Sequence, residues 1–90
     1  MLNLVHVNAF LAVMEGGGFH EAARRLGIGQ STVTEHVRQL ERALGQVLIE
    51  RHRTGCVPTR AGSTFAPYAR SLIATAAGAK ARVSGARVAL

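Results

Sequence analysis

Hydrophobic residues in segment 19–45 recur with the spacing of two short helices joined by a tight turn. The apolar positions are Phe19, Ala22, Ala23 and Leu26 in the first helix, and Val33, Val37, Leu40 and Leu44 in the second. Steps of three and four residues place each set on one face of a helix. Gly27 and Gly29 interrupt the pattern, and Gly45 ends it. Because the side chains of Ala22 and Ala23 are small, we expect the two helices to cross closely and steeply, as in a helix-turn-helix.

A further helix is predicted before this pair and a short hairpin after it. Leu4, Val7, Leu11 and Met14 form an apolar stripe over residues 3–15, flanked by Phe10 and Val13, and the helix ends at three consecutive glycines. Segments 46–50 and 56–58 have the composition of two short strands, and Gly55 suits the connection 51–55 between them. Three helices would then enclose a small core, and the hairpin would form a wing beside it.

A long C-terminal helix is predicted from Arg60, with Thr59 as its N-cap. Its apolar residues alternate between steps of four and three, which is typical of a coiled-coil seam: Phe65, Ala69, Leu72, Ala76, Ala79 and Val83. Pro67 is expected to bend this helix near its start, and residues 84–90 are expected to fray. The predicted fold class is mainly α, with a winged helix-turn-helix in residues 1–58 and a linker or dimerisation helix with its tail in residues 59–90.

The second helix of the central pair has a polar outer side. It carries Ser31, Thr32, Thr34, Glu35, Arg38, Gln39 and Arg42, all of which have hydrogen-bonding side chains. Such a surface suits the reading of base edges in DNA. An ordinary solvated helix face has a similar composition, so this pattern alone leaves both interpretations open.

The charge of the chain favours nucleic acid as a partner. Its 90 residues include 11 Lys and Arg but only 5 Asp and Glu, which gives a net charge of +6. All five acids precede Arg51, and every charged residue from Arg51 onward is basic. A strongly basic half is the electrostatic footprint of a nucleic-acid binder.

A membrane surface is also anionic, but the sequence gives this alternative little support. The longest apolar run near the N-terminus, residues 9–14, is far shorter than the ~20 residues that span a bilayer. No basic stretch precedes that run, as it would in a signal peptide. The single cysteine, Cys56, forms no internal disulfide. We therefore predict no membrane partner and a cytoplasmic location.

The sequence predicts neither an enzyme nor a metal site. His52 and Cys56 lie four residues apart, while the other histidines are scattered, whereas a structural zinc site requires four converging ligands. The glycines at 16–18 do not follow a strand, so they do not indicate a phosphate-binding loop. No paired carboxylates suggest acid–base catalysis. We expect no catalytic residue and no cofactor.

The central pair and its flanks closely resemble the N-terminal DNA-binding domain of the LysR-type transcriptional regulators. The matching residues are Phe10, Val13, Glu15, Gly18, Phe19, Ala22, Ala23, Leu26, Ile28, Gln30, Ser31, Val33, Thr34, Leu40, Glu41, Leu44, Gly45, residues 48–51 and residues 59–62. A helix-turn-helix pattern alone is weak, but this match runs in order from about residue 4 to residue 73. The resemblance identifies the chain as a bacterial regulator domain that binds specific DNA sequences.

The resemblance also implies how DNA is contacted. The residues implied in the major groove are Gln30, Thr32, Thr34 and Glu35, and those implied at the backbone or in the wing are Ser31, Arg38, Arg51, His52, Arg53 and Thr54. Four positions depart from the family. Relatives often have serine or threonine at the position of His20, a serine N-cap at Gly29, arginine or glutamine at Glu35 and arginine at Thr54. Glu35 could accept from cytosine N4 or pair with Arg38 or Gln39 along the helix, and both interpretations stay open.

In the family, the C-terminal helix pairs two subunits in an antiparallel arrangement. The resemblance therefore implies a homodimer on double-stranded DNA with an interrupted inverted repeat, and a tetramer is an option for a full-length form. Nothing in these 90 residues corresponds to the family's C-terminal effector-binding domain. An alternative interpretation, from another class of protein, is a helical dimerisation or protein-interaction module whose basic charge is incidental.

Overall fold

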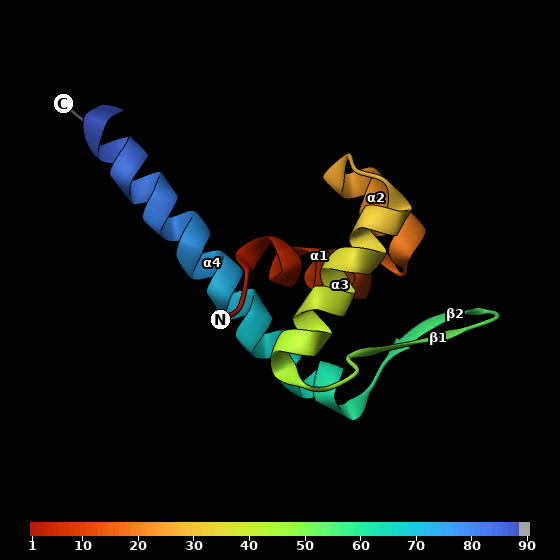
Figure 1. Ribbon diagram of the computed structural model, residues 1–90. Helices are drawn as coiled ribbons and strands as arrows, with labels where there is room; N and C mark the ends of the chain where they lie inside the picture. The colour runs from red at the N-terminus through yellow and green to blue at the C-terminus, as the bar shows by residue number, and fades with distance from the viewer. Residues whose placement is uncertain (89–90) are drawn as a thin grey trace.

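The computed structural model describes residues 1–88 and contains a helical body with a two-stranded hairpin and a long C-terminal helix (Figure 1). The elements follow in the order α1 (Leu4–Gly16), α2 (Phe19–Leu26), α3 (Gln30–Leu44), β1 (Ile49–His52), β2 (Gly55–Pro58) and α4 (Arg60–Val88). This is the predicted mainly α fold, a winged helix-turn-helix followed by a long helix. No helix in residues 1–88 has the length and apolar character needed to cross a membrane.

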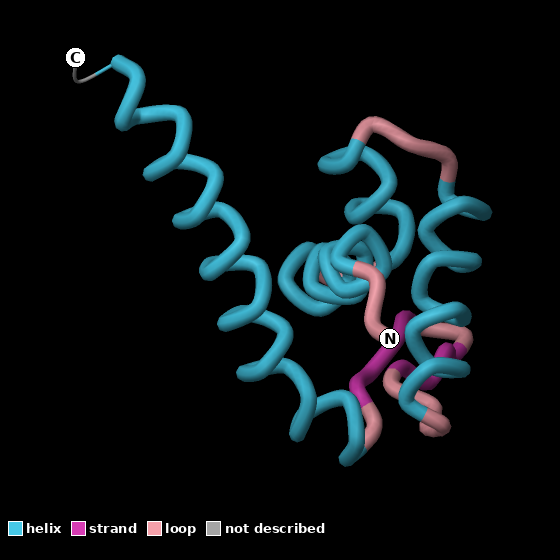
Figure 2. The backbone as a smooth tube through the Cα atoms, turned by 60° about the vertical axis from the view of Figure 1, so that its left-hand side comes forward, coloured by secondary structure: helices cyan, strands magenta, loops and turns pink. Residues whose placement is uncertain are grey.

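Helix α1 lies at the centre of the body and contacts α2, α3 and α4. Figure 2 views α1 nearly along its axis, between α4 and the other two helices. Its buried residues cover most of its circumference and are Val7, Ala9, Phe10, Leu11, Ala12 and Val13. The predicted stripe was therefore partly wrong, since Leu4 is 43% exposed, whereas the flanking Phe10 and Val13 are buried. A helix that packs against neighbours on several sides must be apolar on all of them.

Glycines end both helices of the central pair, as the sequence predicted. Gly27 and Gly45 have φ values of 67° and 69°, in the left-handed region that glycine adopts without steric cost. The apolar faces of α2 and α3 meet the core through Ala22, Ala23 and Val33, whose side chains are buried. The alanines leave room for α3 to approach, and the polar side of α3 stays on the surface.

The wing is an antiparallel hairpin with a two-residue turn, Arg53 and Thr54, because His52 pairs with Gly55. The first strand was predicted at residues 46–50 but begins at Ile49. Strand β1 starts late because a carboxylate binds the backbone where the strand was expected to begin. Glu41 Oε2, from α3, accepts hydrogen bonds from the backbone nitrogens of Leu48 at 2.8 Å and Ile49 at 3.3 Å. The backbone just before β1 is therefore bound to α3 instead of to a partner strand.

The same segment is also fixed to the start of α4. The backbone nitrogen of Thr59 donates to the carbonyl of Leu48 at 2.9 Å, and its hydroxyl donates to the carbonyl of Val47 at 2.6 Å. The Thr59 hydroxyl oxygen accepts from the backbone nitrogen of Gly62 at 3.0 Å, so Thr59 caps α4 as predicted. A Cβ atom at Gly62 would overlap the carbonyl oxygen of Leu48. Only glycine permits this approach of α4 to the connecting segment.

The first turns of α4 pack into the core. Ala66 and Ala69 are buried, and the ring of Phe65 lies 5.7 Å from that of Phe10 in α1. Ala69 therefore faces the core, contrary to the prediction that it forms part of a dimer seam, whereas Phe65 is half-buried against α1. Coiled-coil spacing and ordinary core packing both place apolar residues every three or four positions, so spacing alone did not separate them.

Beyond these turns α4 leaves the body and extends as a separate arm (Figure 1), which lengthens the molecule to 53 Å along its longest axis. Pro67 lies within this helix, which continues through it. The predicted fraying tail was residues 84–90. Helix α4 instead runs to Val88, and residues 89–90 lie outside the described part of the chain.

We predict that Gly62→Ala destabilises the protein by about 1–3 kcal/mol, because the new methyl group would overlap the Leu48 carbonyl. The matched control is Gly78→Ala in the exposed part of α4, where a Cβ atom meets nothing within 4 Å. That change should stabilise the helix by up to about 1 kcal/mol. Denaturant unfolding of both variants measures the difference, and equal effects would contradict the close approach at Gly62.

We also predict that Glu41→Ala lowers the free energy of unfolding by about 1–3 kcal/mol, since two backbone N–H groups lose their acceptor. Glu41→Gln keeps a neutral oxygen acceptor and should cost less. The comparison is made by denaturant unfolding at neutral pH. A glutamine variant as unstable as the alanine variant would show that the carbonyl oxygen alone does not hold the segment.

Candidate nucleic-acid interface

The outer side of α3 presents a polar surface around its N-terminus. Most of the predicted DNA-contacting residues on α3 are exposed, and Thr34 is half-buried. The exposed ones are Gln30, Ser31, Thr32, Glu35 and Arg38. The opposite side of the helix is apolar, with Val33, Val37 and Leu40 in the core. This division leaves the polar side chains free to meet a ligand along the helix.

The N-terminal end of α3 has no side-chain cap. Gly29 occupies the N-cap position with an extended backbone, and its carbonyl accepts from the nitrogens of Thr32 and Val33. The hydroxyl of Ser31 makes no capping hydrogen bond either. An uncapped helix N-terminus directs backbone N–H groups and the positive end of the helix dipole at whatever lies in front of it, and both favour an anion such as phosphate.

The wing and the N-termini of α2 and α3 border one shallow hollow of about 190 Å³. Its lining residues are Gly18, Phe19, Gln30, Arg51, His52, Gly55 and Cys56. In Figure 1 the hairpin projects from beneath α3, away from the α4 arm. The polar side of α3 and the wing therefore share one side of the molecule.

Within the wing, His52, Arg53 and Thr54 are exposed. Arg53 and Thr54 form the turn, which lies at the tip of the hairpin. His52 Nε2 lies 3.8 Å from a carboxylate oxygen of Glu50, a pair that carries charge on both sides only when the histidine is protonated. The tip can thus present a guanidinium and a hydroxyl to an anionic backbone.

Arg51 is placed differently from the other wing residues. Its Nη2 donates to the Thr34 hydroxyl oxygen at 2.5 Å, and its guanidinium carbon lies 3.7 Å from the ring centroid of Phe19. One side chain of β1 therefore contacts both α2 and α3. The sequence alone does not reveal this link, because no local spacing connects Arg51 to residues that lie 17 and 32 positions away.

Glu35 is paired along α3, but with a residue we did not anticipate. Its carboxylate oxygen lies 4.0 Å from Arg42 Nη1, two turns further along the helix, rather than beside Arg38 or Gln39. Both side chains are substantially exposed, so this ion pair contributes little to stability. The pair leaves Arg38 as an exposed cation next to Thr34 on the helix surface.

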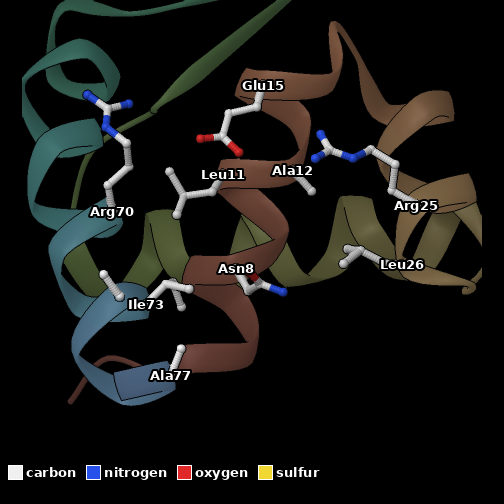
Figure 3. A pocket seen from close by; sticks show the side chains of 10 residues that line it. Asn8, Leu11, Ala12, Glu15, Arg25, Leu26, Arg70, Ile73 and Ala77 are labelled. Carbon is white, nitrogen blue, oxygen red and sulfur yellow. The ribbon is translucent and has the colours of Figure 1, made fainter. Parts of the chain in front are cut away.

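The α4 arm has an exposed apolar edge. Of the predicted dimer seam, Leu72 is 38% and Val83 72% exposed, Ala79 is exposed and Ala76 is half-buried. A groove of about 390 Å³ runs between α1 and this part of α4, with Leu11 and Ile73 on its walls. In Figure 3 the carboxylate of Glu15 stands at one end of the groove, and the side chains of Arg70 and Arg25 lie on either side of it.

Residues 1–88 contain no group of three or more His, Cys, Asp or Glu side chains that could hold a metal ion. His52 and Cys56, the pair considered from the sequence, both line the hollow beside α2.

Comparisons with known proteins agree with this arrangement. A sequence model described as "Bacterial regulatory helix-turn-helix protein, lysR family" matches residues 4–63. The chain is 43% identical over 72 residues to the small neutral protease regulatory protein of Streptomyces coelicolor, covering 80% of this chain and 22% of that protein. It is 47% identical over 64 residues to the HTH-type transcriptional regulator ClcR of Pseudomonas putida, covering 71% of this chain and 22% of the relative. The chain thus spans about a fifth of the length of these two curated relatives.

Solved structures are similar over nearly the whole chain. The CbnR DNA-binding domain, in a complex with DNA, superposes with a TM-score of 0.85 at 34% identity, covering 94% of this chain and 98% of that one. Oxidized OxyR of Corynebacterium glutamicum gives a TM-score of 0.92 at 30% identity, covering 97% of this chain and 27% of OxyR. The match over residues 4–63, together with these relatives, shows that the chain belongs to the LysR family of bacterial regulatory helix-turn-helix proteins.

Proposed function

We propose that this chain binds double-stranded DNA in a sequence-specific manner, as the DNA-binding part of a bacterial transcriptional regulator. The observation that carries the proposal is the exposed, uncapped N-terminal half of α3 beside the wing. An α-helix fits the major groove, and a hairpin beside it can reach the adjoining backbone or minor groove. The similarity to the CbnR domain, which was solved in a complex with DNA, supports the same role.

Gln30, Thr32, Thr34 and Glu35 are the proposed base readers. Glutamine can pair with N6 and N7 of adenine, and threonine can contact a thymine methyl group or donate to a base acceptor. Glu35 has no donor and repels phosphate, so its proposed role is to accept from cytosine N4 when it is not paired with Arg42. A guanine contact of the kind that arginine makes is not proposed at this position.

Backbone contacts are proposed for Ser31 and Arg38 on α3 and for His52, Arg53 and Thr54 on the wing. The N–H groups at the start of α3 can bind a phosphate directly. Arg53 and Thr54 form the exposed wing turn and can reach the minor groove or the phosphates beside it. Arg51 belongs to the same surface, but its guanidinium is already engaged by Phe19 and Thr34.

We further propose that two copies pair through the exposed part of α4. One edge of the arm carries Leu72, Ala76, Ala79 and Val83. The two alanines would allow the helices of two copies to approach closely. A two-fold pair would present two α3 helices to DNA, which suits an interrupted inverted repeat. A longer form of the protein could assemble such dimers into tetramers.

The DNA-binding proposal predicts different effects for Gln30→Ala and Arg53→Ala. The first should reduce discrimination between bases at one position, by about 1–3 kcal/mol, since a base-edge contact is lost. The second should weaken binding to all duplexes alike and reduce the slope of log affinity against log salt by about 1. The measurement uses duplexes that the wild-type chain selects from a randomised pool, together with their single-base variants. Each duplex is titrated with protein at several salt concentrations.

A protein-interaction module with incidental basic charge would behave differently in the same experiment. It would bind no duplex measurably and would enrich no sequence from the pool. Equal losses on selected and random duplexes for both variants would remove the separate roles assigned to Gln30 and Arg53.

The dimer proposal predicts that Leu72→Glu converts the chain to a monomer, because pairing would bury a carboxylate from each copy in an apolar seam. Ala81→Glu is the matched control, since Ala81 is exposed on the opposite side of the same helix. Sedimentation equilibrium measures the mass of each variant. A Leu72→Glu chain that still sediments as a dimer would place the interface elsewhere.

A further inference from the structure

The contacts of Arg51 join three separate elements of the DNA-binding face. Its guanidinium stacks over Phe19 at the first position of α2, while its Nη2 donates to Thr34 in α3. Arg51 itself lies in β1, opposite Cys56 of the second strand. A cation over an aromatic ring is held by electrostatic attraction and by packing of the two planes. The side chain is thus held in one orientation before any DNA is present.

The hydrogen bond between Arg51 and Thr34 has a fixed direction. Arginine is only a donor, because its guanidinium is always protonated and has no acceptor site. A threonine hydroxyl has one proton and can either donate or accept. Since the Thr34 oxygen accepts from Arg51, its own proton must point away from the guanidinium. The bond therefore biases Thr34 towards donating to any ligand in front of α3.

We propose that Arg51 is a positioning residue for base recognition, which acts through Thr34 and makes its hydroxyl a donor toward the major groove. This inference rests on the DNA-binding function proposed above and refines it at one base pair. Donor character favours the acceptors of the major groove, which are N7 and O6 of guanine, N7 of adenine and O4 of thymine. It disfavours the amino group of cytosine, which is itself a donor.

The ring of Phe19 explains why the residue must be arginine. A lysine ammonium retains the charge, but it has no plane to stack on the ring and no rigid fork to direct one N–H at Thr34. Adjacent positive charge also polarises the Thr34 hydroxyl and strengthens it as a donor. The positioning role therefore depends on the geometry of the guanidinium and not on charge alone.

Four single variants and one double variant test the inference. Arg51→Met keeps a long side chain over Phe19 but has no donor, and Arg51→Lys keeps the charge. Thr34→Val removes the hydroxyl without disturbing the Arg51–Phe19 stack, so it remains informative if an Arg51 variant folds poorly. Thr34→Ser keeps the hydroxyl. The double variant combines Arg51→Met with Thr34→Val.

All variants and the wild-type chain are used to select duplexes from the same randomised pool, and then to bind the wild-type duplex and its single-base variants. We expect Arg51→Met, Arg51→Lys and Thr34→Val to lose base preference at the same base pair. The ratio of affinities for the preferred and other bases should fall by roughly 3- to 10-fold, which corresponds to the loss of one hydrogen bond. The double variant should lose no more than either single one. Thr34→Ser should retain the preference, and Arg51→Lys should retain the wild-type salt slope.

Arg53→Met is the control for an ordinary phosphate contact, with uniform weakening expected on every duplex. The inference is overturned if Arg51→Met behaves like Arg53→Met and keeps the wild-type base preference. It is also overturned if the Arg51 and Thr34 variants lose preference at different base pairs. A wild-type chain that enriches no sequence overturns the DNA-binding function, and the inference with it.

Discussion

The connecting segment before the wing is the constraint on which the arrangement of this domain depends. Its backbone nitrogens at Leu48 and Ile49 are held by the Glu41 carboxylate, and its carbonyls at Val47 and Leu48 are held by Thr59. These bonds join the end of α3, the start of β1 and the start of α4. Buried backbone groups are costly when unpaired, so the segment has few alternative positions. The arrangement of α3, the wing and the α4 arm follows from this one joint.

A small domain can expose one face of a helix only if the opposite face is well packed. Helix α1 provides that support, because it is apolar around most of its circumference and lies beneath both α2 and α3. Ala22 and Ala23 contribute little volume, which lets α3 lie close to the core while its polar side chains remain in solvent. The exposed surface that we propose for DNA is thus a consequence of packing on the far side of the same helix.

Local signals in the sequence predicted most of the fold. Gly27 and Gly45 mark helix ends through their backbone freedom, and Thr59 marks a helix start through its hydroxyl, so each acts within a few residues. The inward position of Ala69 was not predicted, because core packing and a dimer seam have the same spacing. At the candidate site, periodicity indicated which side of α3 is exposed. It carried no information on contacts between distant segments, such as that between Arg51 and Thr34.

The position of Arg51 shows why charge is an incomplete guide to a DNA-binding surface. A basic residue in a wing is naturally assigned to phosphate, and Arg53 at the hairpin tip fits that assignment. Arg51 has the same charge, yet its guanidinium is oriented by an aromatic ring on one side and a hydroxyl on another. Charge near a phosphate raises affinity for every sequence, whereas a fixed donor can act only where an acceptor lies opposite. Two arginines two residues apart can therefore contribute separately, one to affinity and the other to discrimination.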